Sequence, residues 1–225
     1  MRQLIKDILH TTKYAPIYFK YRHSTLLGQW PYMENLALVA RALKQPSLAD
    51  GVIVECGTWR GGMAAGLIEI GGRQRRYLFC DSFEGMPPAR DIDGEAAKRW
   101  QADTASPKFH NNCAASLQEF EETIRRTAIS FGQVTIKKGY FSDTFPTFQS
   151  PPVSILRLDA DWYDSTMQCL EKFFDRVIPG GLIIVDDYYV FDGCSRAVHE
   201  FLARRQAREH IGQGPVGRTA YLIKL

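Results

Sequence analysis

The sequence predicts an α/β protein with a mostly parallel sheet and helices on both of its faces. Two features of the chain lead to this prediction. Short apolar runs, rich in β-branched and aromatic residues, recur along the chain, as expected of strands buried on both faces of a parallel sheet. Amphipathic stretches of helical period separate these runs. The 225 residues suit one ordinary domain, and 45% hydrophobic with 24% charged residues excludes a disordered or fibrous chain.

The individual elements follow from these patterns. Residues 1–50 form an N-terminal helical and aromatic segment, and residues 51–225 form the sheet domain. The expected parallel strands lie at residues 52–54, 77–79, 134–136, 153–156 and 182–185, and an antiparallel edge strand lies at 219–224. The expected helices lie at residues 62–70, 116–129, 165–177 and 193–208. Residues 86–113 fit no strand–helix unit, and a long irregular insertion is typical of a lid.

Charge and cysteine content exclude several classes of partner. Twenty-eight basic and 25 acidic residues give a net charge of +3, a bias too weak to predict a nucleic-acid partner. The five cysteines are odd in number and lack C-x-x-C spacing, which is typical of reduced thiols rather than disulfides or zinc ligands. No apolar run approaches the roughly 20 residues that cross a bilayer. We expect a cytoplasmic protein that binds neither nucleic acid nor membrane, with homo-oligomerisation left open.

Acidic residues follow four of the expected strands. Because the carboxyl ends of parallel strands meet at one edge, where ligands bind in open α/β sheets, we expect these side chains to share a site. Acidic residues also favour loops and helix starts in general, but acidic ends on four of the five expected parallel strands exceed that background. The residues are Glu55, Asp81, Asp159, Asp161, Asp186 and Asp187.

A glycine-rich turn follows the first expected strand. Residues 55–62 read Glu-Cys-Gly-Thr-Trp-Arg-Gly-Gly and lack the G-x-G-x-x-G spacing of dinucleotide-binding turns. The acidic residue at the strand end would repel a pyrophosphate and favours a ligand with a charged amine. Asp81 stands where a carboxylate accepts hydrogen bonds from ribose hydroxyls. An amine-bearing nucleoside without phosphates points to S-adenosylmethionine as the cofactor.

Asp159, Asp186 and Asp187 form a second constellation. Neighbouring parallel strands lie about 4.8 Å apart, so carboxylates at adjacent strand ends can reach one divalent cation. Oxygen ligands favour Mg²⁺, Mn²⁺ or Ca²⁺ over zinc. Without a cation, clustered carboxylates repel one another, which raises their pKa values. The alternative interpretation is that Asp186 and Asp187 cap the following helix.

Two other functions fit part of this pattern. Asp159-Ala160-Asp161 matches the D-x-D pattern of metal-dependent glycosyltransferases, although that function leaves Glu55 and Asp81 unexplained. A non-catalytic nucleoside-binding module is also compatible with the glycine-rich turn, but simple binding does not need the three aspartates.

Longer motifs extend the pattern over most of the chain. They are residues 54–62 (VECGTWRGG), 80–87 (CDSFEGMP), 139–144 (GYFSDT), 156–166 (LRLDADWYDST), 179–188 (PGGLIIVDDY) and, more weakly, 34–36 (ENL). Together they resemble the macrocin-type (TylF/MycF/NovP-like) sugar O-methyltransferases over residues 30–205. The segment 87–115 and the N-terminus match the family poorly, and both are expected to touch the acceptor.

The resemblance implies a Mg²⁺-dependent class I methyltransferase with a Rossmann-like, seven-stranded sheet. Glu55 and Gly57 would line the methionine end of the cofactor, Asp81 and Ser82 the ribose, and residues 140–142 the adenine. The full implied cofactor set is Glu55, Cys56, Gly57, Thr58, Asp81, Ser82, Tyr140, Phe141, Ser142 and Asp159. The implied metal ligands are Asp159, Asp186 and Asp187, and Asp159 would also be the general base.

The implied acceptor is a small molecule, a sugar hydroxyl of a glycosylated natural product. Such a hydroxyl is a weak acid, and coordination to a dication makes loss of its proton to a carboxylate feasible. Two neighbouring hydroxyls that chelate the metal would orient one oxygen toward the methyl group. A vicinal diol is therefore the favoured acceptor, and a catechol-type phenol is the alternative.

Overall fold

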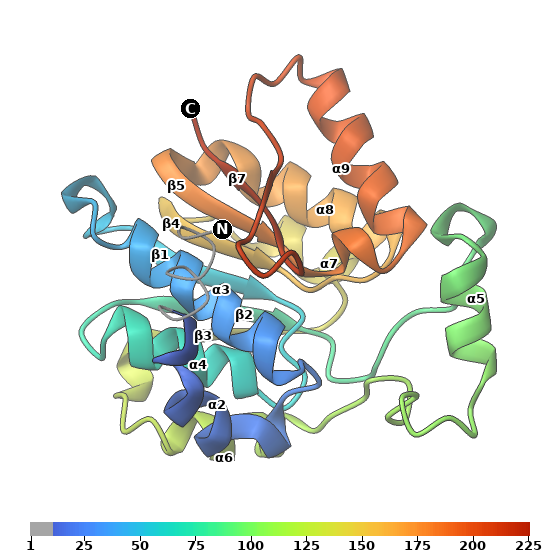
Figure 1. The fold of residues 1–225 in the computed structure, drawn as a ribbon, viewed down its shortest axis with the longest axis horizontal. Coiled ribbons are helices and arrows are strands. Elements are labelled where there is room, and N and C mark those ends of the chain that lie inside the picture. Colours follow the sequence, from blue (N-terminus) through green and yellow to red (C-terminus); the bar gives the residue numbers. More distant parts are fainter. Residues whose placement is uncertain (1–10) are drawn as a thin grey trace.

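A seven-stranded sheet forms the centre of the protein in the computed structural model, which describes residues 11–225 (Figure 1). The strand order is β3-β2-β1-β4-β5-β7-β6. β1 to β5 are parallel, whereas β7 pairs antiparallel with both β5 and β6. The predicted fold class is thus confirmed. The strands are β1 (Val52–Cys56), β2 (Tyr77–Asp81), β3 (Val134–Lys138), β4 (Val153–Leu158), β5 (Val177–Val185), β6 (Gly212–Gln213) and β7 (Ala220–Ile223).

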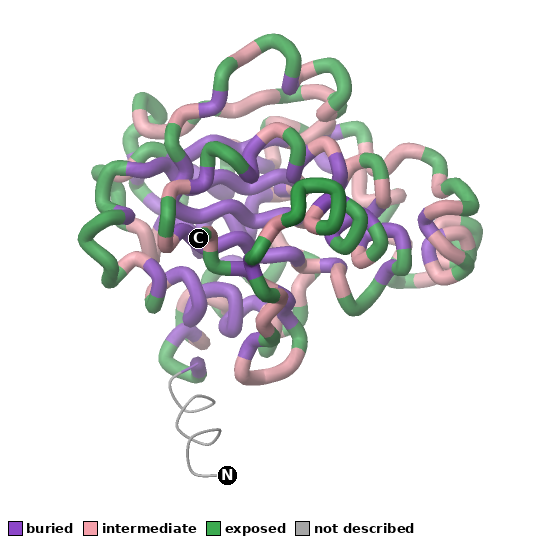
Figure 2. Tube along the Cα trace, turned by 90° about the horizontal axis from the view of Figure 1, so that it is seen from above, coloured by how far each residue is buried: buried purple, intermediate pink, exposed green. Residues whose placement is uncertain are grey.

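Helices cover both faces of this sheet (Figure 1). One layer contains α2 (Ala15–Tyr21), α3 (Gln29–Ala42), α4 (Gly62–Gly71) and α6 (Leu117–Arg125), and the other contains α8 (Tyr163–Phe173) and α9 (Asp192–Arg204). Successive strand residues face opposite layers, so the central strands are buried on both sides (Figure 2). No helix among residues 11–225 has the length and apolar character needed to cross a membrane.

Some element bounds differ from the sequence prediction. The helix expected to end at residue 177 ends at Phe173, because Val177 already pairs with Val153 of β4. β5 therefore starts five residues before the apolar run at 182–185, and a register shift accommodates its proline and glycines. The helix expected at 116–129 ends at Arg125. The N-terminal helical face expected at Leu4, Ile5, Ile8 and Leu9 lies outside the described residues.

The insertion at 86–113 contains a helix that the sequence pattern did not reveal. α5 (Glu95–Ala102) lies at the periphery of the molecule, away from the sheet (Figure 1). The two ends of the insertion are joined, since Asn112 Nδ2 donates to the Met86 carbonyl at 2.7 Å and Met86 N donates to the Asn112 carbonyl at 3.1 Å. Trp162 Nε1 also donates to the carbonyl of Pro87 at 2.8 Å. The insertion is therefore anchored at its base, and its closure over a site stays a prediction.

Candidate active site

The turn between β1 and α4 lies in direct backbone contact with the end of β4. Asp159 N donates to the Cys56 carbonyl at 2.9 Å. Gly57 has φ +82°, and a Cβ at this position would overlap the carbonyl oxygen of Asp159. Only glycine permits both this conformation and this close approach. The glycine of the turn thus brings the expected cofactor-binding segment against the first of the expected metal ligands.

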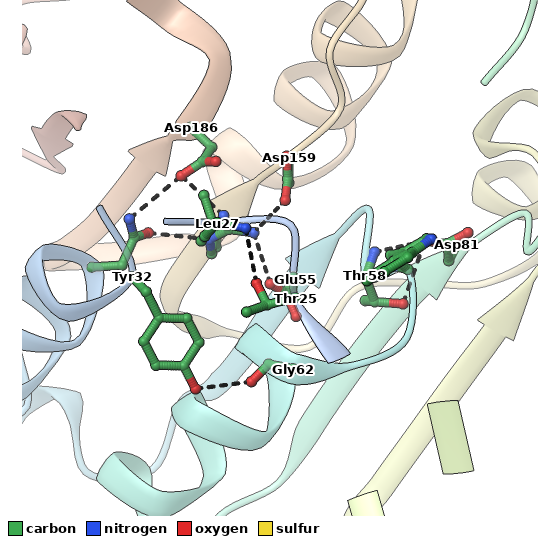
Figure 3. Close-up of polar contacts among 12 residues, drawn as sticks. Thr25, Leu27, Tyr32, Glu55, Thr58, Gly62, Asp81, Asp159 and Asp186 are labelled. Atoms are coloured by element: carbon green, nitrogen blue, oxygen red, sulfur yellow. Dashed lines mark hydrogen bonds and ion pairs between the residues drawn. The ribbon is translucent and has the colours of Figure 1, made fainter. Parts of the chain in front are cut away.

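Asp81 holds together the turns that follow β1 and β2 (Figure 3). Its Oδ2 accepts hydrogen bonds from Thr58 N at 2.6 Å and Trp59 N at 2.8 Å, and its Oδ1 accepts one from Phe83 N at 2.7 Å. Burial raises the pKa of the Asp81 carboxyl, and these backbone donors oppose that rise. Asp81 therefore fixes the backbone of the two turns that border the expected ribose region.

The remaining expected cofactor residues gather beside Asp81. Gly139 N donates to the Asp81 carbonyl at 2.9 Å, which places the segment after β3 next to the end of β2. Tyr140 precedes the short helix α7 (Phe141–Thr144), and the Phe141 ring stacks on Phe145. Ser82 donates its hydroxyl to the Gly85 carbonyl at 3.1 Å. A cavity of about 450 Å³ lies next to this region; its lining includes Arg60, Phe83 and Lys138 but none of the expected cofactor residues.

A buried guanidinium joins three of the strand-end carboxylates (Figure 3). Arg157 Nη1 lies 2.8 Å from Glu55 Oε1 and 2.9 Å from Asp159 Oδ2, and Nη2 lies 2.9 Å from Asp186 Oδ1. Asn35 of α3 accepts from Arg157 Nε at 3.1 Å. Glu55 and Arg157 are fully buried. Burial raises the pKa of Glu55 to about 8, although Arg157 acts to lower it.

The carboxylates of Asp159, Asp161 and Asp187 form a compact acidic cluster. One ligand oxygen from each lies within 4.8 Å of the others. Asp161 has a left-handed φ of 56°, and its backbone N donates to Asp187 Oδ2 at 3.1 Å. Burial raises the pKa values of Asp161 and Asp187, and the neighbouring carboxylates raise them further.

The structure groups the predicted metal ligands differently from the sequence. Asp159 and Asp187 come together, with Asp161 as the third member of the acidic cluster, whereas Asp186 pairs with Arg157. Burial raises the pKa of Asp186 to about 6, and Arg157 opposes that rise. The predicted contribution of neighbouring carboxylates to a raised pKa is present at Asp186 and Asp187, but burial is the larger cause at both.

Sequence reasoning missed Arg157 and Asn35 and did not count Asp161 among the metal ligands. A signal for Arg157 was available, because a charged residue inside the buried run Ile155–Leu158 needs charged partners. Asp161 stands two residues after Asp159, and only the left-handed turn shows that both carboxylates reach one point. Asn35 had no local signal beyond the weak 34–36 motif.

The strand order, the glycine turn after β1 and the acidic strand ends together define a class I methyltransferase fold and site. Known methyltransferases share this architecture. The solved structure of the O-methyltransferase NovP superimposes with a TM-score of 0.73 and 26% sequence identity, covering 89% of this chain and 82% of that one. The profile of the macrocin-O-methyltransferase (TylF) family matches residues 23–216. The chain belongs to this family and is an O-methyltransferase.

Two curated relatives show the same similarity. The chain is 35% identical over 193 residues to 8-demethyl-8-(2,3-dimethoxy-alpha-L-rhamnosyl)-tetracenomycin-C 4'-O-methyltransferase of Streptomyces olivaceus, covering 80% of this chain and 72% of the relative. It is 34% identical over 179 residues to mycinamicin III 3''-O-methyltransferase of Micromonospora griseorubida, covering 74% and 67%. Membership of this family excludes the two alternatives, a glycosyltransferase and a non-catalytic binding module.

Proposed function

We propose that this enzyme transfers the methyl group of S-adenosylmethionine to a sugar hydroxyl of a glycosylated natural product, with Mg²⁺ bound beside the acceptor. The names of the two curated relatives, which methylate a rhamnosyl-tetracenomycin and a mycinamicin, support this acceptor class. The observation that carries the proposal is the contact between Gly57 and Asp159, which sets the cofactor turn against the acidic cluster.

We propose that the methionine end of the cofactor lies beside Glu55. The Oε2 atom of Glu55 is buried and has no hydrogen-bond partner among the described residues. A buried acceptor without a partner is costly, and the ammonium group of the cofactor would satisfy it. The backbone of Gly57 and Thr58 would line the same end, while Asp81 and Ser82 would contact the ribose. The segment at 140–142 would flank the adenine.

The acidic cluster fits Mg²⁺ by its chemistry. Three carboxylates that converge within 4.8 Å supply only oxygen ligands, and the raised pKa values of Asp161 and Asp187 support a bound cation, because a cation would favour their charged forms. We propose Asp159 and Asp187 as ligands together with Asp161, and Asp186 as a ligand through the oxygen that does not face Arg157. When bound, the dication would stabilise the negative charge that develops on the acceptor oxygen.

The chain's own residues align the reactants and take the acceptor proton. Alignment of donor and acceptor can supply about 7–11 kcal/mol of the barrier. We propose Asp159 as the general base. Asp161 is a second candidate for this role. Asp159 Oδ2 already accepts from Arg157 at 2.9 Å, whereas Asp161 lies in the same acidic cluster and is not among the carboxylates that Arg157 contacts.

Single-turnover methyl transfer across a Mg²⁺ series tests this proposal. We expect EDTA to abolish transfer to a rhamnosylated polyketide and Mg²⁺ to restore it. Asp186→Asn and Asp187→Asn should be partly rescued by excess Mg²⁺, because each removes one proposed ligand charge. Asp159→Asn should resist rescue, since loss of a general base costs about 10²–10⁴ in rate.

Three outcomes would change the proposal. Full activity in EDTA would contradict the metal. Metal rescue of Asp159→Asn, with Asp161→Asn resistant, would move the base to Asp161. Faster transfer to catechol than to any glycoside would favour a phenol as the acceptor.

A further inference from the structure

Arg157 is the one arginine that connects the cofactor half of the site with its metal half among the described residues. Its Nη1 atom serves two carboxylates at once, Glu55 Oε1 at 2.8 Å and Asp159 Oδ2 at 2.9 Å. Its Nη2 atom faces Asp186 Oδ1 at 2.9 Å. These three carboxylates come from the ends of β1, β4 and β5, so one side chain sets the relative positions of three strand ends.

The sheet register places Arg157 at this point. Glu55 and Arg157 are direct partners in the β1–β4 pairing, and Arg157 pairs with Ile184 in the β4–β5 register. Directly opposed residues of paired strands project to the same face. Both side chains therefore point toward α3, where Asn35 Oδ1 accepts from Arg157 Nε at 3.1 Å. Asn35 in turn donates to the Thr219 hydroxyl at 3.2 Å, which fixes it against the β7 side.

The Arg157 side chain does not reach the reacting atoms directly. It is fully buried, whereas about a third of the Asp159 side chain is exposed. The charge-assisted hydrogen bonds of the planar guanidinium fix the directions of the Glu55 and Asp159 carboxylates, which a flexible ammonium does not do, and Asp186 is attracted by the ion pair to Nη2. The Oε2 of Glu55 has no hydrogen-bond partner within residues 11–225, so it is available to a ligand.

We propose that Arg157 is a positioning residue that presets both halves of the active site before cofactor and metal bind. It aims Glu55 at the cofactor's ammonium group and holds Asp159 and Asp186 at the metal. The inference rests on the proposed function for the identity of the two ligands. It assigns Arg157 no contact with the acceptor or with the methyl group.

Arg157→Lys tests this role because it keeps the charge and removes the planar fork. The affinity for S-adenosylhomocysteine is measured in EDTA by calorimetry, and the affinity for Mn²⁺ is measured without cofactor by electron paramagnetic resonance. Loss of charge-assisted hydrogen bonds predicts that each affinity falls about tenfold or more. The matched control is Arg204→Lys, which alters an exposed arginine paired with Glu171 and should change neither affinity.

A second variant, Glu55→Gln, separates the effect on cofactor binding from the effect on metal binding. Glu55→Gln should weaken S-adenosylhomocysteine binding and leave Mn²⁺ affinity nearly unchanged, whereas Arg157→Lys should weaken both. If Arg157→Lys does not fold, Asn35→Leu removes the acceptor of Arg157 Nε while keeping the guanidinium. It also removes the 3.4 Å contact of Asn35 with Asp186, so for this variant the loss of S-adenosylhomocysteine affinity is the result that tests Arg157.

Several results would overturn the proposal. A folded Arg157→Lys protein that has a lower melting temperature but wild-type affinity for both ligands would reduce Arg157 to a structural residue. Loss of one affinity alone would refute the shared role. Wild-type protein that binds no Mn²⁺ would contradict the metal of the proposed function but not the positioning of Glu55. In that case, unchanged S-adenosylhomocysteine affinity in Arg157→Lys would overturn the positioning of Glu55 as well.

Discussion

Asp81 illustrates how one carboxylate can organise a turn and still be available to a ligand. Three backbone N–H groups, from residues 58, 59 and 83, donate to its two oxygens. The Thr58 hydroxyl also donates to Oδ2, at 3.4 Å, whereas within residues 11–225 Oδ1 accepts only from Phe83 N. Each carboxylate oxygen offers about two acceptor positions, so Oδ1 retains capacity for a ribose hydroxyl. The same residue therefore shapes the turns around the proposed cofactor site and belongs to the proposed ribose contacts.

Asp81→Asn should weaken cofactor binding more than it slows the chemical step. The amide keeps the size of the side chain, but it offers one acceptor oxygen and an NH₂ group that faces backbone donors. Loss of charge-assisted hydrogen bonds predicts a dissociation constant roughly 10- to 150-fold higher, measured by calorimetric titration. Asp175→Asn is the matched control, because this exposed aspartate pairs with Arg205 outside the cofactor site and its substitution should leave the affinity unchanged. Unchanged affinity in Asp81→Asn would remove Asp81 from the cofactor site.

At the scale of elements, the insertion at 86–113 has two distinct parts. α5 extends away from the sheet, whereas the end of the insertion forms a turn in which His110 to Cys113 all have φ between 47° and 57°. Left-handed backbone is unfavourable for residues other than glycine, although asparagine tolerates it. Burial raises the pKa of the Cys113 thiol, and so do Asp161, Asp159 and Asp187, so this turn lies near the acidic cluster.

Limited proteolysis should detect closure of this insertion. Lys108 is exposed between α5 and the left-handed turn, so trypsin should cut after it early in the free enzyme. If the insertion closes as a lid, S-adenosylhomocysteine and acceptor together should slow this cleavage severalfold, because closure lowers the population of open conformers. Cleavage after Arg208, which is exposed beyond α9, should be unaffected and serves as the internal control. Equal rates at Lys108 with and without ligands would argue for a permanently fixed insertion.

At the scale of the whole molecule, burial of the strand-end carboxyl groups makes their ionised forms unfavourable. Glu55, Asp161, Asp186 and Asp187 all have pKa values raised mainly by burial. The folded protein therefore holds protons that the unfolded chain releases at lower pH. Because the folded state binds more protons over this range, the free energy of unfolding falls as pH rises.

Thermal unfolding in EDTA should show this pH dependence directly. We expect the melting temperature to fall by several degrees between about pH 5 and pH 8, the window between the unfolded carboxyl pKa values and the pKa of about 8 for Glu55. Mg²⁺ should raise the melting temperature most at pH 8, because it binds the ionised carboxylates of the folded state. Glu55→Gln should make the slope in EDTA shallower. A melting temperature that rises with pH in EDTA would contradict the raised pKa values.

The sequence by itself determined the strand–helix alternation, the glycine turn and the acidic strand ends. These features are local, because strands buried on both faces are mostly apolar and the close approach of the first turn to β4 requires glycine at Gly57. The longer motifs also indicated the family, which the match over residues 23–216 confirmed. Even the position of the site at the carboxyl edge follows from the parallel pairing that such strands adopt.

The tertiary structure decided which of these residues meet. The register of β1 on β4 makes Arg157 the partner of Glu55, and a shift by one residue would send each side chain to the opposite face of the sheet. The left-handed φ of Asp161, rather than its sequence spacing, brings it to Asp159 and Asp187, while Asp186 turns to Arg157. Strand register and single-residue backbone conformation depend on packing across the whole domain, so the local sequence pattern could supply the carboxylates but not their grouping.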